Sequence, residues 1–368
     1  MMFTQPAAAA ASLIVLGVVL WDAFETMIVP RTVSRRLRLA RLYFGFVWGG
    51  WSSIAARVKN GRRRERFLAV FGPLSLAAMA GGWAVGLVLG FAGLQWAAGS
   101  HLHPVGGRPL LDDIYMSGTT FFTLGLGDVE PFGRAARVIT VAEAGTGFAF
   151  LATVISYFPV LYQSFSRREA QLTLLDAWAG SPPAGAEVLR RLASRGELAQ
   201  LQSFLKDWEY WCSEVLESHI SYPGVAYFRS QHQHQSWVSA LAAILDLSAL
   251  VEVGIDGIPT WQAHATFAIA RHAAADLTQV LHTKTDVKTD RLPPDGLEEL
   301  RRQLEAVGLA PRRSPEADAQ LARLRRSYEP FICGLAHELM MPLPPWRHDA
   351  GARDNWETNE RRVADVHL

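Results

Sequence analysis

The sequence predicts an all-α membrane protein, with three transmembrane helices followed by an all-α cytoplasmic domain. Two observations predict this fold class. Three apolar runs within residues 1–165 are each long enough to cross a bilayer core, which takes about 20 helical residues. In residues 166–368, apolar residues recur at helical spacing and strand-like alternation is scarce.

The two parts differ in charge, although the whole chain is nearly neutral. Its 368 residues hold 36 Lys and Arg against 35 Asp and Glu. Residues 1–165 carry 14 basic and 8 acidic residues, which leaves 22 and 27 for residues 166–368. This balance excludes a wholly basic nucleic-acid-binding protein. The two cysteines, Cys212 and Cys333, exclude a disulfide scaffold and a CxxC metal site, and we expect both to be buried, reduced thiols.

The first apolar run covers residues 7–29 and is interrupted by only two charged residues, Asp22 and Glu25. A cleaved signal peptide is the competing interpretation. The run lacks a positively charged start, and an arginine-rich segment follows it directly, so we expect a retained membrane anchor.

The basic segment after this run predicts the orientation in the membrane. Residues 31–66 hold eleven Lys and Arg and one acid, Glu65. Because such segments stay in the cytoplasm, we expect the N-terminus outside the inner membrane of the cell and residues 166–368 in the cytoplasm. Residues 42–56 are apolar and aromatic but too short to span. We expect an amphipathic helix or hairpin in the inner interface, with Trp48 and Trp51 at headgroup level, or a buried helix.

The second and third runs are the longest. Residues 67–98 carry no charge, and residues 135–165 carry only Arg137 and Glu143. The connection between them contains Asp112 and Asp113, which suit the N-terminus of a short helix. A Thr-Leu-Gly-Leu-Gly-Asp segment, residues 123–128, follows. Glycines at alternate positions permit an extended backbone whose carbonyls turn to one side, and a row of carbonyls can replace the hydration shell of a cation.

These residues resemble the signature of pore-loop potassium channels, Thr-x-x-Thr-x-Gly-aromatic-Gly-Asp followed by proline. The chain offers Thr120, Phe121, Phe122 and then Thr123-Leu124-Gly125-Leu126-Gly127-Asp128, with Pro131 close behind. The resemblance covers helix, pore loop and helix. It implies a re-entrant pore helix and a selectivity filter that binds K⁺ ions through the carbonyls of residues 123–126 and the Thr123 hydroxyl, with Gly127 and Asp128 shaping its outer mouth. Tyr115 is expected in the aromatic packing around the filter.

The resemblance divides the chain into residues 1–66, a pore module at 67–165 and a cytoplasmic domain at 166–368. One pore loop cannot enclose an ion pathway, so a homotetramer in the lipid bilayer is implied. Leu126 replaces the usual aromatic residue. A potassium-selective channel is therefore the first hypothesis, and a non-selective monovalent cation channel or a membrane receptor with a vestigial pore loop are the alternatives.

The resemblance also suggests gating candidates. Gly147 falls about where the family's inner helix has its hinge, although Gly145 and Gly147 also suit close helix packing. Pro159 could kink the cytoplasmic end. Glu143 must find a partner or water, and we expect it to pair with a polar group of the pore helix such as Thr119 or Thr120, or to face the cavity and attract cations.

Asp22 and Glu25 lie three residues apart and share a helix face. They could pair with Arg31, Arg35 or Arg36, or they could couple the first helix to the gate. A ligand, pH, lipid or tension are the alternatives for the stimulus that opens the gate, and a regulatory ligand would bind the cytoplasmic domain.

No catalytic set emerges from the remaining residues, so we expect no enzyme and no cofactor beyond K⁺ in the filter. The histidines are expected in the core or on the surface, with a metal site or pH sensor as the alternative. Eight of the eleven histidines are candidates for such a site: His101, His103, His219, His232, His234, His264, His272 and His282. Helices are expected at the leucine-rich segment 189–208 and at 237–253, 263–281, 297–307 and 317–328.

Overall fold

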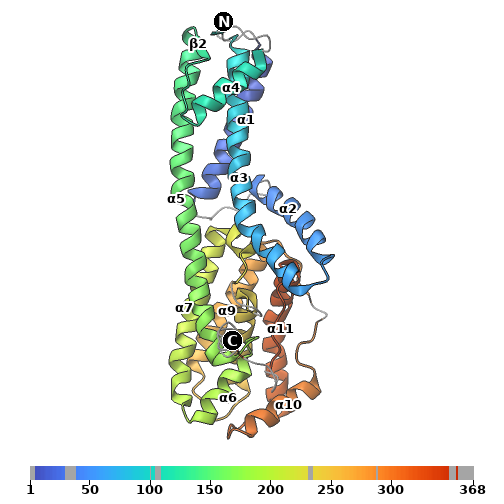
Figure 1. The fold of residues 1–368 in the computed structure, drawn as a ribbon. Helices are drawn as coiled ribbons and strands as arrows, with labels where there is room; N and C mark the ends of the chain where they lie inside the picture. The colour runs from blue at the N-terminus through green and yellow to red at the C-terminus, as the bar shows by residue number, and fades with distance from the viewer. Residues whose placement is uncertain are drawn as a thin grey trace, which may run out of the picture. The chain divides into compact units, whose positions relative to one another are not determined.

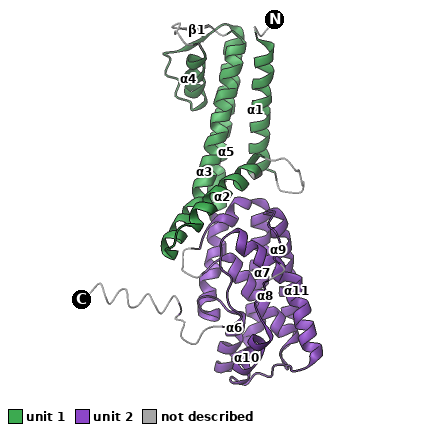
Figure 2. Cartoon of the chain, turned by 90° about the vertical axis from the view of Figure 1, so that its right-hand side faces the viewer, with its two compact units in different colours: residues 1–162 green, residues 163–368 purple. Residues whose placement is uncertain are grey.

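The computed structural model describes residues 5–29, 39–99, 101–103, 109–230, 235–286, 289–347 and residue 354. The chain divides into two compact units, Met1–Tyr162 and Gln163–Leu368 (Figure 2). The all-α prediction is confirmed: helices make up nearly all of the secondary structure of the described residues. A two-stranded antiparallel pair, β1 (His101–His103) with β2 (Glu130–Phe132), is the exception.

Unit 1 holds the three predicted transmembrane helices (Figure 1). They are α1 (Pro6–Met27), α3 (Gly61–Ala97) and α5 (Arg134–Ala179), and each is long and apolar enough to cross a membrane. Large apolar side chains on the surface belong mostly to this unit; Leu13 is 55% exposed and Ile14 is 65% exposed. An apolar outer surface is what a lipid-facing protein requires.

Glycines let α1 lie closely along α3. A Cβ atom on Gly90 would come within 2.6 Å of the Leu16 side chain, and one on Gly93 would collide with the Ser12 hydroxyl. Van der Waals packing at small residues is the main attraction between helices in lipid, where apolar burial adds little. This glycine face therefore sets the distance between α1 and α3.

The apolar segment at residues 42–56 is a single helix, α2 (Leu39–Ala56), so the hairpin alternative is wrong. Trp51 stacks on Phe67 of α3 with ring centroids 4.3 Å apart, and its indole donates to the Phe67 carbonyl at 3.2 Å. Trp48 is buried next to Phe71, with ring centroids 4.8 Å apart. One face of α2 is thus fixed to α3 through aromatic rings.

Unit 2 is a helical bundle around α8 (Trp237–Val253), whose side chains are almost all buried. The end of α5 and the following elements surround it: α6 (Gly185–Arg195), α7 (Leu201–Ser221), α9 (Trp261–Val280), α10 (Pro294–Glu305), α11 (Pro315–Glu338) and the 3₁₀ turns Leu198–Gln200 and Pro223–Tyr227. Ser236 caps α8, because its hydroxyl accepts from the Ser239 amide at 3.0 Å. The leucine-rich segment 189–208 forms two helices, because Gly196 adopts a left-handed conformation with φ of 70° after α6.

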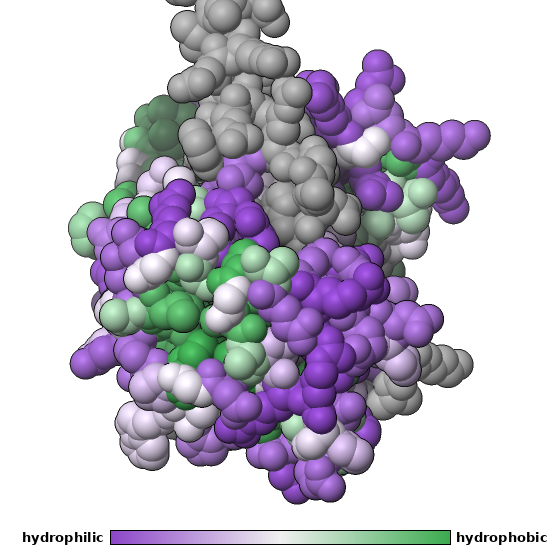
Figure 3. Space-filling view, turned by 90° about the horizontal axis from the view of Figure 1, so that it is seen from below, coloured by the Kyte–Doolittle hydropathy of each residue, from purple (hydrophilic) through white to green (hydrophobic). Residues whose placement is uncertain are grey.

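Unit 2 differs from unit 1 in that few large apolar side chains lie on its surface. The face seen in Figure 3 is largely hydrophilic, with a confined hydrophobic area. Inside the unit, Asp246 is fully buried but accepts two hydrogen bonds from Arg291, at 3.1 and 2.6 Å, and one from the Tyr328 hydroxyl at 2.6 Å. A buried carboxylate needs such partners to offset its desolvation, so this cluster ties α8 to α11 and to the segment before α10. Cys212 and Cys333 are both buried and free, as expected.

Candidate functional site

The short helix predicted before the glycine segment is α4 (Pro109–Phe121), which packs against α3. The Ser117 hydroxyl donates to the Val88 carbonyl of α3 at 2.7 Å. Phe121, at the end of α4, is fully buried, and its ring lies 5.7 Å from that of Phe150 on α5. The helix is therefore held from two sides at the point where the glycine segment begins.

The backbone of residues 123–127 alternates in conformation. Thr123, Gly125 and Gly127 have positive φ angles of 58°, 56° and 75°, whereas Leu124 and Leu126 between them do not. The amides of Leu124 and Gly125 donate to the Thr119 carbonyl at 2.8 and 3.3 Å. Glycine adopts positive φ at little cost, whereas Thr123 is strained by it. The segment is thus anchored to the last turn of α4 and continues as a non-helical backbone in which positive φ angles recur at every second residue.

No described part of the chain packs over this segment. Leu124 and Leu126 are each 62% exposed, and residues 122–128 all lie at the surface. An extended, non-helical backbone at membrane depth is tolerated only when it is buried in protein or lines a water-filled cavity. The segment therefore requires further copies of the chain, or water, on its open side.

Tyr115 and Asp128 connect α4 to the end of this segment. The Tyr115 hydroxyl donates to the Asp128 carboxylate at 2.7 Å, and the other carboxylate oxygen accepts from the Val129 amide at 3.1 Å. Aromatic packing was expected for Tyr115, but the contact that the structure shows is this hydrogen bond. Asp128 is thereby fixed on both oxygens where the chain turns toward β2.

Glu143 lies on α5 and is fully buried. Its carboxylate contacts the hydroxyl of Ser117, which is a polar group of the predicted pore helix, although the sequence had suggested Thr119 or Thr120 as examples. All three are hydroxyl residues of α4, but Ser117 is the one that turns toward α5, while the Thr119 hydroxyl donates to the Met116 carbonyl of its own helix. The contact joins the second half of α4 to the first turns of α5.

Residues 86–163 match a family model described as "Ion channel". This range contains the end of α3, all of α4, the glycine segment and the first part of α5, which are the elements described above. These residues are therefore similar to ion channels. The membrane spans and the channel-type architecture predicted from the sequence are therefore confirmed.

A comparison with curated proteins finds one weak relative. The chain is 22% identical over 186 residues to YdjJ, an uncharacterized membrane protein of Bacillus subtilis strain 168. The match covers 50% of this chain and 53% of the relative, so the chain spans about half the length of the curated relative it matches. No solved structure matches the chain.

In the ion-channel segment, Gly147 of α5 lies very close to the backbone at the end of α4. A Cβ atom there would collide with the carbonyl oxygen of Phe121, whereas one on Gly145 would meet nothing within 4 Å. Gly147 therefore serves packing between α5 and the end of α4. Pro159 lies within α5, which continues as one helix to Ala179.

One face of α5 in the ion-channel segment is exposed along its length. Its residues follow alternating steps of three and four, the pattern of a helix that packs against other helices. They are Val138, Val141, Gly145, Phe148, Ala152, Ile155, Pro159 and Tyr162. Val141, Phe148 and Ile155 are each about 70% exposed, at 73%, 69% and 72%.

Asp22 of α1 is buried and contacts two other helices. One carboxylate oxygen accepts from the Trp83 indole of α3 at 2.9 Å, and the other accepts from the Ala40 amide of α2 at 3.3 Å. Asp22 therefore joins three helices. Glu25 lies half-buried on the same helix, and Arg31, Arg35 and Arg36 fall outside the described residues.

The sequence did not single out Ser117, Trp83 or Gln95 as partners. The Gln95 amide of α3 donates to the Ala136 carbonyl at 3.1 Å and the Thr140 hydroxyl at 3.0 Å, both on α5. Each of the three is a polar group within or next to an apolar run. Such a group must find a hydrogen-bond partner inside the protein. Its position in an apolar run could therefore have marked it as one end of a contact between helices.

The described residues contain no group of three or more His, Cys, Asp or Glu that could hold a metal ion. His264 and His272 are exposed and face Glu252 and Asp276, each at 3.3 Å. His101 and His103 lie on β1, and His232 and His234 fall outside the described residues. His219 is buried in unit 2.

Proposed function

We propose that the chain is one subunit of a homotetrameric potassium channel, which conducts K⁺ passively and catalyses no reaction. The filter would be Thr123-Leu124-Gly125-Leu126-Gly127-Asp128, with K⁺ ions as its ligands. The observation that carries the proposal is the alternation of positive φ at Thr123, Gly125 and Gly127 directly after the short helix α4. Alternation of this kind can direct successive carbonyl oxygens to one side, where they replace the water around a cation.

The exposed surfaces of unit 1 support the tetramer. One copy of the filter segment leaves its open side uncovered, and a ring of four copies would cover it. The exposed stripe of α5 offers a face on which neighbouring copies could pack, because its spacing of three and four repeats without interruption from Val138 to Tyr162. A closed ring with cyclic symmetry uses such a face in every copy.

Potassium efflux from liposomes tests conduction. We expect purified chain to release K⁺ from loaded vesicles and Gly125→Asp to abolish the release, because a ring of four copies would bring four added carboxylate side chains together at one level of the proposed filter. Gly61→Asp is the matched control. Gly61 is exposed at the start of α3 with nothing within 4 Å of an added Cβ. Absence of flux from the folded wild-type chain would favour a membrane receptor with a vestigial pore loop.

Selectivity needs its own measurement, because Leu126 stands where the resemblance expects an aromatic ring. A non-selective monovalent cation channel is the second candidate for that reason. Reversal potentials under bi-ionic conditions separate the two. We expect a strong preference for K⁺ over Na⁺, and equal permeability would refute the potassium assignment.

The proposed orientation places the N-terminus outside and unit 2 in the cytoplasm, across the inner membrane. Both native cysteines are buried, at 0% and 4% exposure, so their background reaction with a thiol reagent is low. We expect an impermeant reagent to label Gln5→Cys in intact cells but to label Glu197→Cys only after permeabilisation. The reverse pattern would invert the topology.

A further inference from the structure

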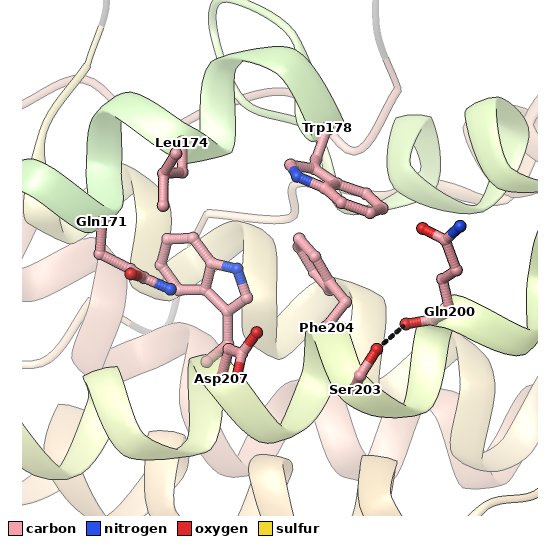
Figure 4. Close-up of a pocket in the computed structure, with 8 residues that line it drawn as sticks. Gln171, Leu174, Trp178, Gln200, Ser203, Phe204 and Asp207 are labelled. Carbon is pink, nitrogen blue, oxygen red and sulfur yellow. Dashed lines mark hydrogen bonds between the residues drawn. The ribbon is translucent and has the colours of Figure 1, made fainter.

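A small cleft lies within unit 2 between the last turns of α5 and the first turns of α7 (Figure 4). Its volume is about 160 Å³, well below the several hundred Å³ typical of sites that enclose a drug-sized ligand. The cleft therefore suits a small ligand, or one compact group of a larger ligand.

Aromatic rings form much of the wall of this cleft. Trp178 projects from α5 toward Phe204 of α7, with ring centroids 5.0 Å apart and planes inclined by 42°. Trp208 follows one turn later on α7, with its ring 6.0 Å from that of Phe204. Phe204 and Trp208 are buried, whereas Trp178 is only half-buried. The faces of aromatic rings are electron-rich and attract cations, and tryptophan does so most strongly.

The polar groups of the cleft add negative charge without a counter-ion. Asp207 lies at the same place on α7 and is exposed, and its carboxylate makes no hydrogen bond or ion pair with any residue that the structure describes. The side-chain amide of Gln171 on α5 likewise has no partner among those residues. Lys, Arg and His are absent from the residues that line the cleft.

From these features we propose that the cleft binds a small organic ammonium ion, with its methyl groups against Trp178 and its charge near Asp207. A bare metal cation would require several oxygen ligands, and the described residues hold no cluster of three acids, histidines or cysteines. An anion would be repelled by Asp207. A methylated ammonium ion combines an apolar surface with a diffuse positive charge, which is the combination that aromatic walls and one carboxylate recognise.

Choline is a suitable probe, and equilibrium dialysis of the labelled compound against the purified full-length chain measures its binding. We expect one saturable site per chain in excess KCl. The neutral isostere 3,3-dimethyl-1-butanol should compete poorly, because it has the same shape without the charge. Competition as effective as that of choline itself would overturn the proposal, as would the absence of saturable binding to the folded chain.

Two substitutions test whether choline binds at Trp178 and Asp207. Asp207→Asn and Trp178→Leu should each weaken binding roughly tenfold, in line with a cation–π or charge contact of this exposure. Glu214→Gln is the matched control, because Glu214 is an exposed acid two turns further along α7. If Trp178→Leu fails to fold, Asp207→Asn decides, because it changes only an exposed side chain. Unchanged binding in folded variants refutes the assignment.

The inference is independent of the proposed conduction. Tetraalkylammonium compounds can also enter cation pores, so Gly125→Asp distinguishes the two locations. Choline binding that persists in Gly125→Asp, although flux is lost, places the ligand in the cleft. Choline binding that disappears in Gly125→Asp places it in the pore and overturns the proposal.

Discussion

The hydroxyl of Tyr115 donates a 2.7 Å hydrogen bond to the carboxylate of Asp128. Tyr115 lies in α4, before the glycine segment in the sequence, and Asp128 is the last residue of that segment. The bond therefore closes a loop, residues 115–128, that contains the alternating backbone at residues 123–127. A hydrogen bond to a charged group is stronger than one between neutral groups, so this contact fixes the Asp128 end of the segment while the Thr119 carbonyl fixes its beginning.

Tyr115→Phe tests this contact. The ring is kept and only the hydroxyl is lost, so we expect a folded protein whose filter is less well held. Because a filter of less defined width discriminates less between cations, the K⁺ preference in bi-ionic measurements should fall. Tyr210→Phe, at an exposed tyrosine of unit 2, serves as the control. Selectivity that is unchanged in Tyr115→Phe would show that Asp128 is held by other contacts.

Gly147→Ala and Gly145→Ala form a matched pair on α5. The added Cβ at residue 147 collides with the backbone of Phe121, which cannot move without shifting α4 and the filter two residues later. We expect loss of flux and a lower melting temperature. At residue 145 the Cβ meets nothing, so alanine should stabilise the helix by about 0.5–1 kcal/mol. The opposite result, with flux lost only in Gly145→Ala, would indicate a hinge at Gly145.

The sequence predicted the elements of the fold better than their contacts. Long apolar runs define membrane helices through length and composition alone, so α1, α3 and α5 were found. The range 237–253 coincides with α8 because a capping serine precedes it and a glycine follows it. The break between α6 and α7 was missed, because leucines continue at helical spacing across Gly196.

Contacts depend on how each helix is rotated about its axis, which a sequence does not specify. Glu143 was expected to contact α4, and it does, but through Ser117 and not through Thr119 or Thr120. Asp22 was expected to pair with arginines close to it in sequence. Those arginines lie outside the described residues, and the structure shows a partner that was not predicted, Trp83, which is 61 residues away and is brought near by the packing of α1 on α3.

Glu143→Gln and Glu143→Ala separate the roles of size and hydrogen bonding at the contact with Ser117. Glutamine has the same shape, and its amide N–H can donate to the Ser117 hydroxyl oxygen, whose single hydrogen goes to the Val88 carbonyl, so stability should change by less than about 1 kcal/mol. Alanine leaves a cavity and an unpaired group, and we expect a loss of about 2–5 kcal/mol. Thermal unfolding in detergent measures both. Equal losses in the two variants would mean that the hydrogen bond to Ser117 has no role in stability.

The imidazole of His219 makes the stability of unit 2 depend on pH. It is fully buried on α7; Nδ1 lies 2.8 Å from the Val215 carbonyl and Nε2 lies 3.1 Å from the Arg168 guanidinium. A carbonyl only accepts and a guanidinium only donates, so the ring is neutral with its hydrogen on Nδ1. Burial first, and the positive charge of Arg168 second, hold the pKa of His219 well below its ordinary value of 6.5.

The direction of the pH effect follows from which state binds the proton. Below pH 6.5 the unfolded chain protonates at His219 while the folded chain does not, so folding should lose up to about 1.4 kcal/mol per pH unit until the folded pKa is reached. His219→Gln should be less stable at pH 7.5 but should lack this loss between pH 6.5 and 5. His272→Gln, at an exposed histidine, should retain it. Denaturation of the full-length chain in detergent, followed by tryptophan fluorescence, measures the slope. If His219→Gln keeps the wild-type slope, another group is responsible for it.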